Sequence, residues 1–197
     1  MLAAGENVNI LVFDTEVYSN TGGQASKSTP TGAVAHFAAA GKPIKKKNLA
    51  QIAMAYGYVY VAQVAMGAGY QQTLNAIIEA ESYDGPSIVI AYSPCIAHGL
   101  KFGMGKSQER IKQAVEAGYW NNFRFDPRKA AEGKNPLTID SKAPSTGYRE
   151  FIDDETRFSK LKHKFPDRAE KLFESAAKDA SERYDLLVKQ QQMFEPK

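Results

Sequence analysis

The stretch NILVFDTEVYSNTGGQ, residues 9–24, places an apolar segment directly before a loop of acidic, hydroxyl, amide and glycine residues. The apolar part, residues 9–13 with Val8 leading in, is typical of a central strand that is buried on both faces. A loop that follows such a strand emerges at the carboxyl edge of an open parallel sheet, where ligands bind. We therefore expect a ligand-binding loop after this strand.

The loop combines oxygen donors with a pair of glycines. Oxygen donors of the kind that magnesium prefers come from Asp14, Thr15, Ser19 and Asn20. The Gly22-Gly23 pair permits positive φ and lets backbone amides approach an anion closely. The composition favours a metal-bound phosphate, and the alternative is a hydrophilic loop that caps the next helix and binds nothing.

Strand and helix patterns alternate through the first half of the chain. Strands are expected over 8–14, 58–65 and 87–92, and helices near 47–56 and 70–82. Asn48 is a candidate N-cap and Gly57 a candidate helix stop. This order predicts an α/β fold with a doubly wound parallel sheet, in which all three strand ends lie on one edge.

The second half of the chain has a different character. A helix over about 107–117 is followed by an aromatic, strand-like segment at 119–125. From residue 126 the sequence is rich in Pro, Gly, Lys and Ser, which predicts an extended wrapping segment, and helices are expected over 148–162 and 166–192. We therefore expect a partial α/β domain over 1–125 and a wrapping segment with C-terminal helices over 126–197. These helices either pack on the domain or form a docking arm.

Composition limits the classes of function. The 197 residues include 43% hydrophobic residues and one cysteine, and the formal net charge is +3. No apolar run is long enough to span a bilayer and no signal peptide is visible, so we expect a cytoplasmic protein without membrane contact. A single cysteine excludes an intrachain disulfide framework. The Lys45–Lys47 run is interpreted as a solvated face, and nucleic-acid binding is not expected.

Several long strings resemble one enzyme family. Asp14–Lys42, DTEVYSNTGGQASKSTPTGAVAHFAAAGK, resembles the thiamine-diphosphate loop of the pyruvate:ferredoxin (flavodoxin) oxidoreductases. The similarity continues through YGYVYVAQVAMG, PSIVIAYSPCIAHG, GMGKSQ, GYWNNFRFDPR and GKNPLTIDSKAP. The resemblance implies a thiamine-diphosphate-binding fold within an oxidoreductase of anaerobic metabolism. That enzyme oxidatively decarboxylates pyruvate to acetyl-CoA, with coenzyme A as co-substrate, and passes electrons through 4Fe-4S clusters to ferredoxin or flavodoxin.

The resemblance also implies roles for individual residues of the loop. Thr15 would offer its hydroxyl and Val17 its backbone carbonyl to magnesium. Asn20 would lie beside the thiazolium and the substrate as a catalytic group. The diphosphate would be supported by Gly22, Gly23 and Gln24. Asp14 either braces the loop through backbone hydrogen bonds, which we favour, or binds the metal directly.

Cys95 is a second candidate site, in the loop YSPCIAHGL directly after the third strand. A lone cysteine is most often an inert, buried, small hydrophobe. Its position on the same edge as the Asp14 loop favours a function, and the resemblance implies a ligand of the 4Fe-4S cluster nearest the thiamine. Such a cluster needs four cysteine ligands, so one cysteine cannot hold it alone.

The start of the sequence indicates a fragment. Leu2-Ala3-Ala4-Gly5 is typical of the last turn of a helix, and the Gly-Asp-Gly turn of thiamine-diphosphate enzymes is not found before Asp14. We therefore expect a missing N-terminal strand, further domains, a homodimer at full length and no activity for this piece alone. The alternatives are the beta subunit of another 2-oxoacid:ferredoxin oxidoreductase and a non-catalytic scaffold fragment.

Other polar motifs are given structural interpretations. The Gly67-Ala68-Gly69 turn opens a helix and is weak evidence for phosphate binding. The segment 103–107, GMGKS, is assigned to helix entry, with an interdomain contact as a further possible role. His36 and His98 are interpreted as packed or surface histidines, and His163 as solvated.

Overall fold

The computed structural model describes residues 1–196, which form a five-stranded mixed sheet in the order β1-β3-β2-β4-β5. Its strands are Asn9–Asp14 (β1), Tyr60–Val64 (β2), Ser87–Tyr92 (β3), Phe123–Phe125 (β4) and Leu137–Ile139 (β5). Strands β1, β3 and β2 run parallel, as predicted, whereas β4 and β5 are antiparallel additions. The carboxyl ends of the parallel strands therefore share one edge of the sheet.

The helices lie on both faces of this sheet. They are Leu49–Met54 (α1), Tyr70–Glu81 (α2), Ser107–Glu116 (α3), Arg128–Ala131 (α4), Tyr148–Asp153 (α5), Thr156–Lys164 (α6) and Pro166–Met193 (α7). Asn48 caps α1 as predicted, because its side chain accepts a hydrogen bond from the Gln51 amide. Short 3-10 turns span Leu2–Ala4, Ser19–Thr21, Ile96–His98 and Met104–Lys106.

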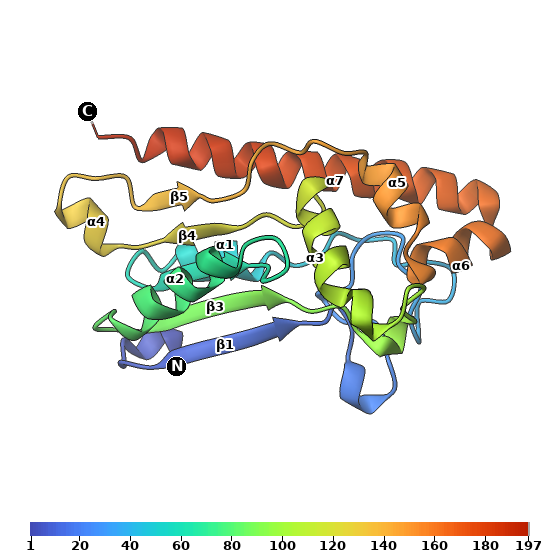
Figure 1. Ribbon diagram of the computed structural model, residues 1–197, viewed down its shortest axis with the longest axis horizontal. Coiled ribbons are helices and arrows are strands. Elements are labelled where there is room, and N and C mark those ends of the chain that lie inside the picture. The colour runs from blue at the N-terminus through green and yellow to red at the C-terminus, as the bar shows by residue number, and fades with distance from the viewer. Residues whose placement is uncertain (197) are drawn as a thin grey trace.

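Alternation along the strands divides the core into two parts. Tyr60, Ala62 and Val64 of β2 pack with α2 on one face. The opposite face, with Val61 and Ile88, packs against α1 and the C-terminal helices and forms the larger core. Figure 1 shows α7 lying along one side of the molecule, from α6 to β5. None of the helices within residues 1–196 has the length and apolar character needed to cross a membrane.

The prediction that the strand at residues 9–13 is central and buried on both faces is wrong. In the sheet formed by residues 1–196, β1 is an edge strand paired with β3. Ile10 and Val12 pack against the larger core, whereas Leu11 is 53% and Phe13 65% exposed. The apolar run predicted burial from composition, but α2 covers β2 and β3 and leaves the outer face of β1 open.

Three other boundaries differ from the sequence expectation. Only residues 123–125 of the aromatic segment form a strand, and the segment after residue 126 contains α4 and β5. The helix expected over 148–162 is divided into α5 and α6, which meet at Asp154 and Glu155. The division between domains at residues 125 and 126 remains a prediction.

Candidate functional site

The candidate site begins where β1 ends. Asp14 lies opposite Tyr92 in the β1–β3 register, and the Ser93 amide donates to the Asp14 carbonyl at 3.1 Å. The loops that follow β1 and β3 therefore leave the sheet side by side. Figure 1 shows both strands pointing toward the end of the molecule that holds α3, α5 and α6. This is the edge at which ligands bind in open α/β folds.

Asp14 braces the loop. Its Oδ1 accepts hydrogen bonds from the Glu16 amide, at 3.0 Å, and from the Ser28 hydroxyl. Its Oδ2 pairs with Lys46 Nζ at 2.6 Å. Both carboxylate oxygens are thus engaged by the protein, which agrees with the favoured bracing role rather than with direct metal ligation.

Thr15 and Val17 bring two oxygen donors together. The Thr15 hydroxyl lies 3.0 Å from the Val17 carbonyl oxygen, to which it donates. Both residues line a hollow of about 260 Å³ at the end of β1. Octahedral magnesium with bonds of about 2.1 Å would hold two adjacent oxygen ligands roughly 3.0 Å apart. The pair therefore fits as two neighbouring ligands of one magnesium ion.

Glu16 lies between these two residues, and its side chain is buried in the protein. It is 2% exposed and has a φ of 59°, an uncommon conformation for a residue other than glycine. Its carboxylate pairs with Lys46 Nζ at 2.9 Å and Arg157 Nη1 at 2.7 Å, and accepts from the Tyr119 hydroxyl at 2.6 Å. Burial alone would raise the pKa of Glu16, but Lys46, Arg157 and Tyr119 outweigh it and lower the pKa to about 2.

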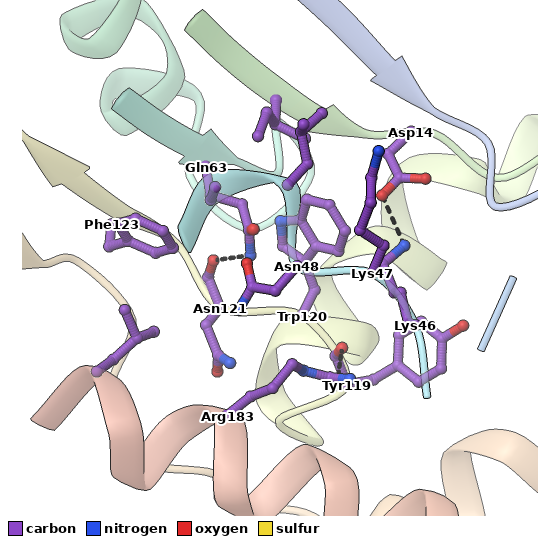
Figure 2. Close-up of a pocket in the computed structure, with 14 residues that line it drawn as sticks. Asp14, Lys46, Lys47, Asn48, Gln63, Tyr119, Trp120, Asn121, Phe123 and Arg183 are labelled. Atoms are coloured by element: carbon purple, nitrogen blue, oxygen red, sulfur yellow. Dashed lines mark hydrogen bonds and ion pairs between the residues drawn. The ribbon is translucent and has the colours of Figure 1, made fainter. Parts of the chain in front are cut away.

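The interpretation of Lys45–Lys47 as a solvated face is wrong for Lys46. Its side chain is only 13% exposed, and besides its two ion pairs the ammonium lies 5.4 Å from the centre of the Trp120 ring. Figure 2 shows Lys46 reaching Asp14 at one end of a small cavity of about 40 Å³. Three consecutive lysines in a sequence do not indicate which of them pairs with two carboxylates in the fold.

The remaining loop residues lie outside the hollow. Asn20 is exposed in the 3-10 turn. Gly22 and Gly23 have φ of 116° and 81°, so the predicted positive φ at both glycines is confirmed. The Gly23 amide donates to the Tyr18 carbonyl and the Tyr18 amide to the Gln24 carbonyl, so the loop closes on itself. Within residues 1–196, the lining of the Thr15 hollow does not include Asn20, Gly22, Gly23 or Gln24.

The cysteine loop touches the Asp14 loop at two points. His98 Nε2 lies 3.0 Å from the Thr15 carbonyl, and because a carbonyl only accepts, Nε2 carries the proton. A Cβ built on Gly23 would lie 3.4 Å from Ala97 Cβ. Burial, reinforced by Arg157, lowers the pKa of His98 to about 4, so the ring is neutral and packed, as expected. Partly buried Cys95 accepts from the Ala97 amide at 3.4 Å.

The donor sets available to cofactors are incomplete in this chain. Within the described residues, no three His, Cys, Asp or Glu side chains are grouped so as to hold a metal. Magnesium would therefore take Thr15 and Val17 oxygens together with oxygens of the diphosphate and of other groups. Cys95 could serve as one of four thiolates of a 4Fe-4S cluster.

Sequence reasoning missed the buried polar cluster behind the loop. Glu16, Lys46 and Arg157 form it, and Arg157 comes from α6, far along the chain. The only local signal was the presence of an acidic residue between two expected metal ligands. The pairing with Arg157 depends on the tertiary fold.

Comparisons with known proteins give two kinds of similarity. Residues 1–91 match the family described as thiamine pyrophosphate enzyme, C-terminal TPP binding domain. The match covers β1 and β2, most of β3 and the whole Asp14 loop. Thiamine pyrophosphate is another name for thiamine diphosphate.

Longer similarities extend beyond this domain. The chain is 58% identical over 189 residues to pyruvate:ferredoxin oxidoreductase of Moorella thermoacetica, covering 96% of this chain and 16% of the relative. It is 57% identical over 184 residues to pyruvate-flavodoxin oxidoreductase of Klebsiella pneumoniae, covering 93% of this chain and 16% of the relative. It is 49% identical over 185 residues to mitochondrial pyruvate dehydrogenase [NADP(+)] of Euglena gracilis, covering 94% of this chain and 10% of the relative. The resemblance to the pyruvate:ferredoxin (flavodoxin) oxidoreductases is confirmed, and the chain spans about 16% of the length of the bacterial relatives.

Proposed function

We propose that this chain supplies the magnesium and diphosphate half-site of a thiamine-diphosphate-dependent pyruvate:ferredoxin or pyruvate:flavodoxin oxidoreductase. The observation that carries the proposal is the Thr15 hydroxyl held 3.0 Å from the Val17 carbonyl, beside a hollow at the carboxyl end of β1. The names of the relatives support pyruvate as the substrate and ferredoxin or flavodoxin as the electron acceptor. Coenzyme A would accept the acetyl group.

Some residues of the chain would bind the cofactor, and others would orient the substrate. Thr15 and Val17 would bind magnesium through oxygen, while Gly22, Gly23 and Gln24 would support the diphosphate. Asn20, exposed on the 3-10 turn, would place its amide beside the substrate and donate to developing negative charge. When bound, thiamine diphosphate supplies the carbon nucleophile and electron sink for decarboxylation of a 2-oxoacid.

The neighbouring loops would place Cys95 close to the thiamine site. His98 donates to the Thr15 carbonyl and Ala97 lies against Gly23, so the cysteine loop and the Asp14 loop contact each other at two points. Cys95 would then be one of the four ligands of a 4Fe-4S cluster that receives the electrons. In the full-length enzyme, Cys95→Ala should remove the paramagnetic resonance signal of one cluster. An unchanged iron content and spectrum would refute this assignment.

Isothermal titration with magnesium and thiamine diphosphate tests the half-site. Thr15→Val keeps the shape of the side chain and removes its hydroxyl, so we expect cofactor binding at least about tenfold weaker, as for the loss of a metal-ligating oxygen. Thr146→Val, at an exposed position, makes the same chemical change and is the control. Equal affinities of the two variants would contradict the proposal.

A further inference from the structure

The loop after β1 is held at Glu16, the residue between the two proposed metal ligands, Thr15 and Val17. The Glu16 amide donates to Asp14 Oδ1 at 3.0 Å, and the Glu16 carbonyl accepts from the Thr29 hydroxyl at 2.6 Å. With a φ of 59°, Glu16 has a conformation that persists only where its surroundings enforce it. Because the peptide units on either side are planar, the dihedral angles of Glu16 contribute directly to the 3.0 Å separation of the Thr15 hydroxyl and the Val17 carbonyl.

Arg157, the second residue of α6, contacts Glu16 from a distant part of the chain. Its Nη1 lies 2.7 Å from Glu16 Oε2, and its Nη2 donates to the Tyr92 hydroxyl at 3.2 Å. The main chain is also fixed, because the Val34 amide donates to the Arg157 carbonyl at 2.9 Å. The side chains of Arg157 and Glu16 are only 3% and 2% exposed, so salt in the solvent screens this ion pair little. Arg157 therefore holds the Glu16 carboxylate in one place.

The other partners of the Glu16 carboxylate do not replace Arg157. The Lys46 ammonium is shared, because it also pairs with Asp14 at 2.6 Å. Tyr119 donates to the same carboxylate oxygen as Arg157, at 2.6 Å, but burial raises the pKa of Tyr119 and keeps its hydroxyl neutral. Without Arg157 the carboxylate would have one shared cation and one neutral donor, which is unfavourable for a charge removed from water. Loss of Arg157 should therefore release Glu16 from its present conformation.

Arg157 lies outside the part of the chain that matches the thiamine pyrophosphate family. The match ends at residue 91, whereas α6 spans Thr156–Lys164. Figure 1 shows α6 at the end of the molecule toward which β1 and β3 point, so a helix from late in the chain reaches the loop after β1. The loop that carries the proposed ligands thus depends on a residue that the family match does not include.

We propose that Arg157 is a positioning residue of the magnesium site. It acts through Glu16, whose fixed backbone keeps the Thr15 hydroxyl and the Val17 carbonyl close enough to bind one metal ion. This inference rests on the proposed function, since it takes the Thr15–Val17 pair as the metal ligands. It adds to that function a dependence of cofactor affinity on the C-terminal helices.

A crystal structure of the Arg157→Met variant without cofactor tests the positioning directly. We expect Glu16 to leave its positive φ and the separation of Thr15 Oγ1 and the Val17 oxygen to change by about 1 Å or more, which neighbouring ligands of one octahedral ion do not allow. A positive φ at Glu16 and an unchanged 3.0 Å pair in the variant would overturn the proposal. This measurement needs no bound magnesium, so its outcome is separate from that of the proposed function.

Isothermal titration of the full chain with magnesium and thiamine diphosphate measures the effect on binding. Under conditions in which circular dichroism shows each variant to be folded, Arg157→Met should bind about tenfold more weakly than the wild type. Arg124→Met is the matched control, because it removes a partly buried arginine of β4 that pairs with Asp140 at 2.8 Å. Its affinity should stay within about twofold of the wild type.

Equal affinities of Arg157→Met and the wild type, or equal losses of affinity in Arg157→Met and Arg124→Met, would overturn the positioning role. Absence of binding by the wild-type chain would contradict the proposed function alone. The structure of the Arg157→Met variant would then still decide whether Arg157 fixes the loop.

A double variant covers the case in which Arg157→Met does not fold. Glu16→Gln/Arg157→Met removes both charges of the ion pair and leaves no buried carboxylate short of a partner, so it should fold. Its affinity should be lowered by the same factor as that of Glu16→Gln, because both changes act at one point. Wild-type affinity in the double variant, or a loss equal to the product of the two single effects, would overturn the proposal that Arg157 acts through Glu16.

Discussion

Glu16 shows how a single residue can hold a binding loop in shape. Its backbone takes positive φ while its carboxylate is buried between Lys46 and Arg157. Thr15 and Val17, on either side, then face the hollow at the end of β1. A strained conformation of this kind persists only where surrounding contacts fix it.

Removing the charge of Glu16 should therefore be costly. Glu16→Gln leaves Lys46 and Arg157 without their buried partner, and we expect a loss of about 3 kcal/mol in the free energy of unfolding. Urea denaturation at neutral pH measures it. Glu182→Gln, which removes an exposed carboxylate paired with Lys45, should change the stability by less than about 1 kcal/mol. A loss for Glu16→Gln no larger than that of the control would show that the buried cluster does not stabilise the fold.

His98 predicts a dependence of stability on pH. Its pKa is lowered from 6.5 to about 4 in the fold, so the unfolded chain binds the proton more readily. Stability should be fully present above pH 6.5 and fall by about 3 kcal/mol as the pH drops to 4, with the lowered pKa of Glu16 adding a further loss below pH 4.5.

Substitution of His98 should remove the change in stability between pH 6.5 and 4.5. His98→Gln retains a donor for the Thr15 carbonyl but does not titrate, so its stability should be flat between pH 6.5 and 4.5. His163→Gln, at a solvated histidine, is the control and should follow the wild type. A wild-type slope in the His98→Gln profile would assign the titration to another group.

At the scale of elements, the C-terminal helices clamp the segment between β1 and α1. Arg157 of α6 enters the buried cluster, and the Val34 amide donates to the Arg157 carbonyl at 2.9 Å. Gly41 lies where this segment meets α6 and α7: its φ is 76°, and an added Cβ would lie 2.7 Å from Leu161 Cδ2. The helices thus pack on the α/β part of the chain, which favours packing over a free docking arm.

Gly41→Ala tests this clamp. It combines an unfavourable φ with a clash, so we expect a loss of about 2–4 kcal/mol in unfolding free energy. Gly133→Ala is a matched control, because its φ is 68° but no other atom of the described chain lies within 4 Å of the added Cβ. It should lose only about 1 kcal/mol, the backbone part. Similar losses in unfolding free energy for both variants would mean that α6 and α7 move aside for the added Cβ at no cost in stability.

Much of the arrangement of elements was predictable, because it depends on local pattern. The apolar runs at β2 and β3, the Asn48 cap and the position of the Asp14 loop after β1 each follow from neighbouring residues. The edge position of β1 could not be predicted, since composition does not tell which neighbour covers Leu11 and Phe13. Nor could the buried pairing of Glu16 with Arg157, because it joins a loop to a helix near the other end of the chain.

At the scale of the whole molecule, one face carries an uncovered apolar groove. It has a volume of about 480 Å³ and is lined in part by Leu11, Phe13, Met66, Ile77, Ile96 and Met104. Apolar patches of this kind are uncommon on isolated globular chains. This groove is therefore a solvent-exposed surface that is suited to binding apolar compounds.

A fluorescent apolar dye should report this groove. We expect the native chain to enhance anilinonaphthalene sulfonate fluorescence, and Phe13→Ser to reduce the enhancement by about half or more, because it removes the most exposed aromatic ring of the groove. Phe37→Ser removes a ring that is 94% exposed elsewhere and should have little effect. Equal reductions would mean that the dye does not bind in the groove.

Thr15 and Val17 are proposed as neighbouring ligands of one metal ion. Crystals soaked with manganese, as a magnesium substitute, and thiamine diphosphate test it directly through anomalous scattering. We expect one anomalous peak within bonding distance, about 2.2 Å, of both Thr15 Oγ1 and the Val17 carbonyl oxygen. A peak bound to the Asp14 carboxylate instead, or full cofactor density with no metal at this pair, would contradict it.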